Sequence, residues 1–465
     1  MHPADRLLSP GVPFLKAVGA RRWRLLQTSI VILIMAASNR AHHFLEGKTI
    51  FVAGSGVAGA AFVAGLYKLW NPEWKAPTIV VFDRDPAEEG LRRESENYSL
   101  SVSGHTEAGG LVALKKLGLI DQVLSSSVSG VDGSGCFKIW GPDWSEKIRA
   151  ARPPLHGLPT ASVRITRKNL RRVLGNATEG WQHSSVEWDS QCLSVARLDS
   201  GRLSVRIRQK RGETTHTFTR ECDLLVAADG ASSKLRACLR PADGLNYTGA
   251  TLRGGLSELK GGLPEPIRKD WGFVVSGSGV VGFVSPVDDH TVIWAVGTQE
   301  PGPLPELDRT SKQDVEAVIS RGGQLGSQFE EPFQTIVSQT DPQTVMCISA
   351  RDKLPFRHDQ GAIKDLPVVF IGDSNHALSP FAGFGANLAL SDAWDLAEQL
   401  CLRGSLPEAV AGYDELSEPR ARKVAESARR SLRAGLSTGW RYWLFSFMLW
   451  IGSWVRWGME TVKGR

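Results

Sequence analysis

The stretch KTIFVAGSGVAGAAFVAGL, residues 48–66, joins an apolar strand to an alanine-rich helix through three glycines. Gly54 permits a tight turn, Gly56 lets the backbone approach a pyrophosphate, and Gly59 allows the helix to pack closely on the strand. The helix N-terminus then offers unpaired N–H groups to phosphates. A second apolar strand, TIVVFDRD, ends at Asp83, whose carboxylate is placed to accept hydrogen bonds from ribose hydroxyls. This order of features predicts a dinucleotide site for NAD or FAD rather than NADP.

Two later segments indicate which dinucleotide is bound. CDLLVAADGASSKLR contains an apolar strand that ends at Asp229 and Gly230. LPVVFIGDSNHALSPFAGFGANLAL contains another strand, which ends at Gly372 and Asp373. A simple nicotinamide dehydrogenase needs neither segment. The glycine-rich turn of the second segment suits reduced flavin, because a helix N-terminus compensates negative charge near flavin N1 without a titratable group.

On these three motifs, the sequence resembles the class A flavoprotein monooxygenases, the single-component FAD-dependent hydroxylases with the p-hydroxybenzoate hydroxylase fold. Within that class it is most similar to the tetracycline-inactivating and fungal secondary-metabolite branch, on ITRKNLRRVL at 165–174, YTG at 247–249 and the end of the Asp373 motif. The resemblance covers roughly Lys48 to Arg433. It implies an α/β fold, in which a Rossmann-type FAD-binding domain is interleaved with an antiparallel β-sheet substrate domain and followed by C-terminal helices.

The same resemblance sets the expected domain boundaries. We expect an N-terminal extension over 1–46, FAD-binding segments over 47–245 and 351–403, a substrate-binding sheet over 246–350, and C-terminal helices over 404–465. Apolar and polar residues alternate between residues 246 and 350, in WGFVVSGSGVVGFVSPV for example, as expected of antiparallel strands.

The resemblance also implies how FAD is held. Asp83 would bind the adenosine ribose, Arg167 would contact FAD, and Asp229 would lie beside the pyrophosphate. Asp373 would bind the ribityl chain, and Pro380 would lie against the flavin face. The complete set of implied cofactor-binding residues is Gly54, Gly56, Gly59, Asp83, Arg93, Ser101, Arg167, Asp229, Gly230, Gly372, Asp373, Pro380, Gly383, Gly385 and Ala386.

Other members of this set are also assigned to the flavin region by the resemblance. Gly383, Gly385 and Ala386 would open a helix whose N–H groups point at the pyrimidine edge. Arg93 and Ser101 fall near the segment that contacts flavin or incoming NAD(P)H in relatives.

Asp373, Ser374 and His376 are the three residue types of a hydrolytic triad, within four positions of one another. Adjacent residues leave a strand end in different directions, whereas triads assemble from distant segments. We therefore interpret Asp373 as a cofactor ligand and His376 as a structural neighbour.

The substrate region is less sharply marked. Arg253, Trp271, Phe283 and Trp294 are candidates for the substrate pocket, and Arg253 is the one candidate for a catalytic role. Each is also consistent with packing or a surface position. In this family the cofactor carries the chemistry, so no catalytic dyad is required.

The resemblance implies that NAD(P)H reduces FAD, that O₂ then forms a flavin hydroperoxide, and that one oxygen is transferred to a lipophilic small molecule of secondary metabolism by hydroxylation or epoxidation. Two alternatives are an FAD-dependent reductase or dehydrogenase of the same superfamily, and a non-catalytic membrane-tethered flavoprotein. The six cysteines include no CxxC pair, and no metal site is expected.

Both ends of the chain carry apolar segments next to basic residues, which indicates membrane attraction rather than nucleic-acid binding. LLQTSIVILIMAA, at 25–37, resembles a signal-peptide core or a short anchor. Residues 440–457, WRYWLFSFMLWIGSWVRW, place tryptophans at spacings of three and four, as on one face of a helix. We expect this helix to lie in one leaflet, with the catalytic domain in the cytoplasm, at the endoplasmic reticulum if the source is eukaryotic. The alternative is that it packs on the protein's own core.

Overall fold

The computed structural model describes residues 42–86, 98–131, 135–150, 152–380 and 383–463, and describes no side chain beyond Ile451. Arg93 and the apolar segment at 25–37 lie outside these ranges. The chain divides into two compact units, Met1–Glu46 and Gly47–Arg465, and every described helix and strand belongs to the second.

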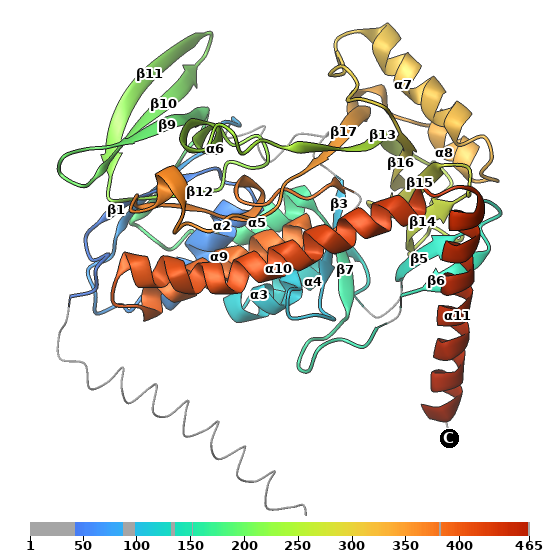
Figure 1. The fold of residues 1–465 in the computed structure, drawn as a ribbon, viewed down its shortest axis with the longest axis horizontal. Coiled ribbons are helices and arrows are strands. Elements are labelled where there is room, and N and C mark those ends of the chain that lie inside the picture. The colour runs from blue at the N-terminus through green and yellow to red at the C-terminus, as the bar shows by residue number, and fades with distance from the viewer. Residues whose placement is uncertain (1–41, 87–97, 132–134, 151, 381–382, 464–465) are drawn as a thin grey trace, which may run out of the picture. The chain divides into compact units, whose positions relative to one another are not determined.

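A parallel sheet with the strand order β18-β12-β1-β2-β8 is the centre of the dinucleotide-binding part (Figure 1). The inner strands are buried along nearly their whole length, as is typical of parallel strands covered on both faces. The strands are β1 (Thr49–Ala53), β2 (Thr78–Phe82), β8 (Ser184–Glu187), β12 (Leu224–Ala227) and β18 (Val368–Phe370).

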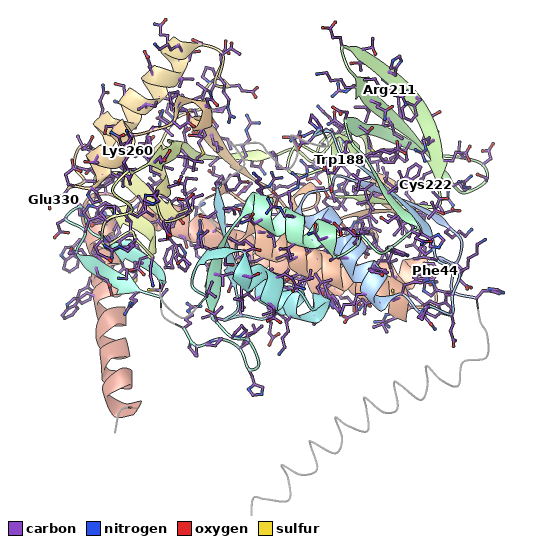
Figure 2. The ribbon with its side chains drawn as sticks, turned by 180° about the vertical axis from the view of Figure 1, so that it is seen from behind. Phe44, Trp188, Arg211, Cys222, Lys260 and Glu330 are labelled. Carbon is purple, nitrogen blue, oxygen red and sulfur yellow. The ribbon has the colours of Figure 1, made fainter. Side chains whose placement is uncertain are left out.

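Different layers cover the two faces of this sheet. Helix α2 (Val57–Leu69) packs on one face and contacts α9 (Gly385–Leu402), since a methyl group at Gly65 would lie 3.1 Å from Ala397 Cβ. The other face, with Phe51 and Phe82, packs against an antiparallel sheet of three strands. These strands are β9 (Ser190–Arg197), β10 (Leu203–Arg211) and β11 (Thr214–Cys222). Figure 2 shows Arg211 near one end of the β10–β11 hairpin and Cys222 near the other.

A mixed seven-stranded sheet, β17-β13-β16-β15-β14-β5-β6, forms the second large layer. All its pairs are antiparallel except β14 with β5. Four strands lie within the expected substrate segment, β17 begins in it and ends two residues beyond it, and β5 and β6 join from outside it. The strands are β5 (Phe137–Trp140), β6 (Glu146–Arg149), β13 (Asn246–Glu258), β14 (Trp271–Val275), β15 (Val280–Pro286), β16 (Thr291–Gln299) and β17 (Met346–Asp352).

Smaller elements connect and cover these sheets. Helices α7 (Lys312–Leu325) and α8 (Phe333–Ser338) pack on the seven-stranded sheet through Trp294 and its neighbours. A three-stranded sheet, β3-β7-β4, lies between the two large layers. The connecting elements are β3 (Ser99–Ser103), β4 (Ser127–Ser129), β7 (Ser162–Thr166), α3 (Gly110–Leu117), α4 (Ile120–Ser125), α5 (Arg167–Asn176), α6 (Lys234–Leu239), η2 (Pro342–Thr344), η3 (Gly361–Ile363) and η4 (Gly372–Ser374).

Two long helices end the chain, α10 (Leu406–Gly435) and α11 (Gly439–Lys463). Helix α10 packs along α9, and Tyr442 of α11 donates from its hydroxyl to Val275 O at 3.3 Å. The opposite side of α11 is open: Trp440 and Trp443 are 71% and 68% exposed. Among the helices that the structure describes, none has the length and apolar character needed to cross a bilayer.

Candidate functional site

The first glycine-rich turn has no room for side chains at two of its three glycines. Gly54 has φ +102°, and a methyl group there would lie 2.5 Å from Ala228 O. A methyl group at Gly59 would lie 2.0 Å from Gly54 O, so α2 could not pack on β1. At Gly56, by contrast, no atom lies within 4 Å of the added methyl, and no side chain caps α2. The turn therefore leaves backbone N–H groups open toward a ligand.

Asp83 is buried at the end of β2 and has defined partners. Its Oδ2 accepts a hydrogen bond from Ser55 N at 2.6 Å, and its Oδ1 accepts one from Asp85 N at 2.9 Å. Arg171 of α5, also buried, lies 3.7 Å from Asp83 Oδ2 and donates to Ser55 O. Sequence reasoning missed Arg171, whose signal was its position four residues after Arg167, on the same side of a helix.

The other two motifs meet at one edge of the parallel sheet. Strands β12 and β18 are neighbours, so Asp229 and Asp373 follow strands that end side by side. Buried Arg236 joins the two turns, because its Nη1 donates to Ser374 O at 2.8 Å and its Nη2 donates to Ala231 O. Burial lowers the pKa of Arg236. This arginine is a second functional residue that the sequence did not single out.

Asp229 has one oxygen occupied and one unpaired. Oδ2 accepts from Lys234 N at 2.9 Å, at the start of α6. Oδ1 is buried and has no hydrogen-bond partner among the described residues. Burial raises the pKa of Asp229. An unpaired buried oxygen of this kind suits a ligand that brings its own hydroxyl or N–H donor.

Asp373 faces the N-terminus of α9. A methyl group at Gly385, the first residue of α9, would lie 3.8 Å from Asp373 Oδ1. Its carboxylate has no hydrogen bond to the described residues, and burial raises its pKa against the opposing charges of His376 and Arg167. No side chain caps α9. An acceptor beside open N–H donors fits the ribityl hydroxyls and pyrimidine edge of FAD.

The residues that imitate a hydrolytic triad have structural partners. Ser374 Oγ donates to Ala227 O at 2.5 Å. His376 Nε2 lies 2.6 Å from Asp392 Oδ2, which also accepts from Gly372 N at 2.9 Å. Burial alone would raise the pKa of Asp392, but His376 and Arg420 hold it well below its usual range. This cluster fixes the Gly372 turn on α9 and α10.

Asn387, in the first turn of α9, was not anticipated. It is fully buried, and its Oδ1 accepts from Ser103 N at 2.7 Å and from Gly110 N at 2.8 Å. Its Nδ2 donates to Ser101 O at 2.8 Å. Ser101 thus touches this region through its backbone, while its hydroxyl lies 3.2 Å from Ser162 Oγ.

The remaining expected cofactor residues occupy open or partly covered positions. Arg167 begins α5 after the cap Thr166, and its charge acts on Asp373. Gly230 and Gly383 have φ of +81° and +58°, and no atom lies within 4 Å of an added methyl at either. Pro380 is exposed.

The four substrate-pocket candidates divide between the two faces of the seven-stranded sheet. Arg253 Nη2 pairs with Glu300 Oε1 at 2.8 Å, and it shares its face with Trp294, which packs against α8. Phe283 and Trp271 lie on the opposite face. Phe283 packs there with Tyr98, which precedes β3. The structure thus brings only Trp271 and Phe283 toward the small sheet.

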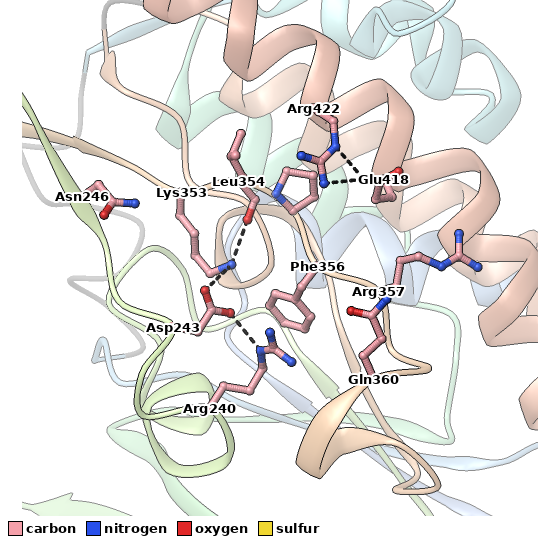
Figure 3. Close-up of a pocket in the computed structure, with 11 residues that line it drawn as sticks. Arg240, Asp243, Asn246, Lys353, Leu354, Phe356, Arg357, Gln360, Glu418 and Arg422 are labelled. Carbon is pink, nitrogen blue, oxygen red and sulfur yellow. Dashed lines mark hydrogen bonds and ion pairs between the residues drawn. The ribbon is translucent and has the colours of Figure 1, made fainter.

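A polar cavity of about 450 Å³ is lined by residues of 240–246, 353–360 and α10 (Figure 3). Lys353 Nζ pairs with Asp243 Oδ1 at 3.0 Å, and Arg240 Nε pairs with Asp243 Oδ2 at 2.8 Å. Arg422 pairs with Glu418. Because these charges are already paired, the cavity is not assigned to the cofactor.

Comparisons with known proteins agree with this arrangement. A family described as "FAD binding domain" matches residues 356–428. The chain is 41% identical over 398 residues to the monooxygenase cfoF of Aspergillus candidus, covering 85% of this chain and 93% of that protein.

Solved structures share the fold. Klebsiella pneumoniae HpxO complexed with FAD and uric acid superposes with a TM-score of 0.67 at 19% identity, covering 90% of this chain and 97% of that one. The tetracycline destructase Tet(51) superposes with a TM-score of 0.60 at 16% identity, covering 87% of this chain and 97% of that one. Because the chain carries all three motifs and is 41% identical to cfoF, it belongs to the class A FAD-dependent monooxygenases.

Proposed function

We propose that this monooxygenase uses NAD(P)H and O₂ to hydroxylate or epoxidise a lipophilic small molecule of secondary metabolism. The observation that carries the proposal is an apolar cluster that packs against Tyr98, whose carbonyl accepts from the backbone N–H of the expected FAD contact Arg167. Leu256, Ile293 and Val287 are buried there, while Tyr98 and Phe283 are partly open. A surface of this kind recognises an apolar scaffold and excludes water.

FAD, when bound, supplies the redox chemistry that activates O₂. The chain's own residues bind and orient it. Asp83, supported by Arg171, would accept hydrogen bonds from the adenosine ribose hydroxyls. Asp229 would lie beside the pyrophosphate, where its unpaired Oδ1 could accept a hydrogen bond from the cofactor. Asp373 would accept from the ribityl hydroxyls. The open N–H groups at Gly385 and Ala386 would stabilise negative charge at the pyrimidine edge.

Asp373→Ala tests the cofactor assignment. The variant is expected to purify largely without FAD, because it removes the carboxylate that lies 3.8 Å from a methyl added at Gly385, beside the α9 N-terminus. Flavin absorbance relative to protein absorbance measures the occupancy. Asp359→Ala is the matched control, since Asp359 is exposed and pairs with Arg357. Normal flavin occupancy in Asp373→Ala would show that the assignment is wrong.

The reaction itself is tested with the purified holoenzyme. A true substrate is expected to accelerate NADPH or NADH oxidation and to consume O₂ in proportion to oxygenated product. Substrate-dependent NAD(P)H oxidation without O₂ uptake would instead identify the reductase or dehydrogenase alternative.

We also propose that α11 attaches the enzyme to an anionic membrane surface. Trp440, Trp443, Phe447 and Trp450 are all more than 40% exposed, and Phe447 stacks on both Trp443 and Trp450. Exposed basic residues lie close to this face in the sequence. They are Lys423, Arg430 and Arg433 in α10 and Arg441 in the first turn of α11. Indole rings and cations together favour the interface of anionic lipids.

Replacing the four aromatic residues by serine tests this attachment without deleting Tyr442, which packs on the core. Flotation with phosphatidylcholine–phosphatidylserine vesicles is expected to fall by about tenfold or more. Leu402→Ser with Leu416→Ser is the control, because both leucines are exposed elsewhere, at 52% and 42%. Equal flotation of the two variants would contradict the proposal.

A further inference from the structure

A buried guanidinium without a carboxylate partner lies where the small sheet meets the seven-stranded sheet. Arg164 of β7 is 4% exposed. Its Nη2 donates to Ser99 O at 2.5 Å and to Ser99 Oγ at 2.7 Å. The Nε of Arg164 is buried and has no hydrogen-bond partner among the described residues. The guanidinium forms no ion pair with any described carboxylate. The Trp271 ring centroid lies 5.8 Å from its guanidinium carbon.

Two other buried arginines have carboxylate partners, and a third, Arg236, donates to several backbone carbonyls. Arg171 faces Asp83 and Asp85, and Arg253 faces Glu300. An isolated buried charge is costly, so proteins normally pair it or hold it for a ligand. Burial lowers the pKa of Arg164 to about 9, and no carboxylate of the described residues opposes this shift. The unpaired Nε, and the lack of a carboxylate partner among the described residues, both point to a negatively charged group supplied by a ligand.

The surroundings show which side of the fold this group would occupy. Ser101 lies opposite Arg164 in the β3–β7 ladder, and Asn387 of the α9 first turn binds Ser101 O. Arg164 therefore pairs in the ladder with a residue whose carbonyl is bound by the helix that would receive the flavin. On its other side, Ser99 Oγ lies 3.1 Å from Ser285 Oγ in β15, close to Phe283 and the apolar cluster.

We propose that Arg164 binds an ionised oxygen, as found in a carboxylate, enolate or phenolate, on the otherwise lipophilic substrate. The inference rests on the proposed function, because it names the substrate class of the same site. A forked guanidinium fixes such an oxygen in both position and orientation. With the apolar cluster beside it, the site would select apolar scaffolds that carry one acidic group. Arg164 is then a positioning and specificity residue.

The test compares 2-naphthoate with the neutral 2-naphthamide as probes of the FAD-loaded enzyme, through the flavin absorbance change. The wild type is expected to bind the acid at least about tenfold more tightly than the amide. Arg164→Gln should abolish this preference while it keeps FAD, and Arg164→Lys should retain part of it. Arg429→Gln is the control. It removes an arginine that pairs with Asp352 and does not contact Arg164, so it should keep the preference for the acid.

Each contrary result has a separate meaning. Equal or undetectable binding of both probes to the wild-type holoenzyme would overturn the inference, and this comparison does not depend on any variant folding. An unchanged preference in Arg164→Gln would also overturn it. A wild-type protein that purifies and reconstitutes without FAD would instead overturn the proposed function.

Discussion

At the scale of single residues, backbone geometry and buried charge decide what each position tolerates. Gly54 is fixed both by its φ of +102° and by the Ala228 carbonyl. Lys353 is 2% exposed, yet it keeps Asp243 as a partner in a polar cavity. The Gly54 position has no room for a side chain. The buried charge of Lys353 is expected to make the free energy of unfolding depend on pH.

Gly54→Ala is expected to destabilise the protein by more than about 2 kcal/mol, because the methyl adds a backbone clash to the strain of the positive φ. Gly201→Ala is the control: its φ is +81°, but no atom lies within 4 Å of the added methyl. That variant should lose only about 1 kcal/mol. Urea unfolding of both measures the difference, and equal losses would contradict the clash.

Lys353→Met tests the buried charge. Burial lowers the pKa of Lys353 to about 8, below its ordinary value of 10.5. Between these values the unfolded chain binds a proton that the folded protein does not, so the free energy of unfolding rises with pH. Wild type should gain on the order of 2 kcal/mol more than Lys353→Met between about pH 7.5 and about pH 10.

The same urea series at each pH measures this gain in both proteins. Groups shared by the two proteins cancel in the difference. Arg240 still pairs with Asp243 in Lys353→Met, so the variant is expected to fold. Parallel pH curves for the two proteins would show that Lys353 does not titrate in this range.

At the scale of elements, one side chain fastens α9 to two other segments. Asn387 satisfies the backbone N–H groups of Ser103 in β3 and Gly110 in α3, and donates to Ser101 O. The open N-terminus of α9 is therefore placed by a contact inside the protein before any ligand binds. Helix position and cofactor affinity should change together when this contact is lost.

Asn387→Ala is expected to cost about 2–4 kcal/mol of stability, since it leaves two buried N–H donors unpaired. It should also weaken FAD binding, measured by flavin fluorescence on titration. Asn71→Ala is the control, because Asn71 accepts one exposed hydrogen bond, from Glu73 N. Unaltered FAD affinity in Asn387→Ala would mean that α9 is positioned by its other contacts alone.

At the scale of the whole molecule, the site is assembled from segments far apart in the chain. The turn at Gly54 follows β1, and the turn at Asp373 follows β18, separated from β1 only by β12 in the sheet. A ligand that contacts both turns binds the folded chain and not the unfolded one. FAD should therefore stabilise the entire second unit rather than a local segment.

FAD at about 100 times its Kd is expected to add about 2.7 kcal/mol to the free energy of unfolding. Thermal unfolding at increasing FAD concentration measures this, with one cooperative transition that moves upward. FAD removal should reverse the shift. A Tm that is independent of FAD would contradict a site built from both turns.

Local sequence determined the cofactor motifs and the fold class. Glycine spacing, apolar strands and terminal acids act over a few residues, so Gly54, Gly59, Asp83 and Asp373 could be proposed as cofactor residues directly. Apolar alternation likewise indicated the substrate sheet. The membrane-like face of α11 was visible as a spacing pattern, and the structure leaves its described aromatic residues exposed.

Only the tertiary structure decided which polar side chains meet. Arg236 and Asn387 contact partners distant in sequence, so no local pattern marks them. The helical spacing of Arg171 from Arg167 is a local signal, but it does not reveal the partners Asp83 and Ser55. Arg253 and Phe283 lie on opposite faces of the seven-stranded sheet. The alternation of apolar and polar residues in their segments does not show which face each side chain occupies. Burial of Arg164 without a counter-ion among the described residues is likewise a property of packing, because charge compensation depends on neighbours in space and not on neighbours in the chain.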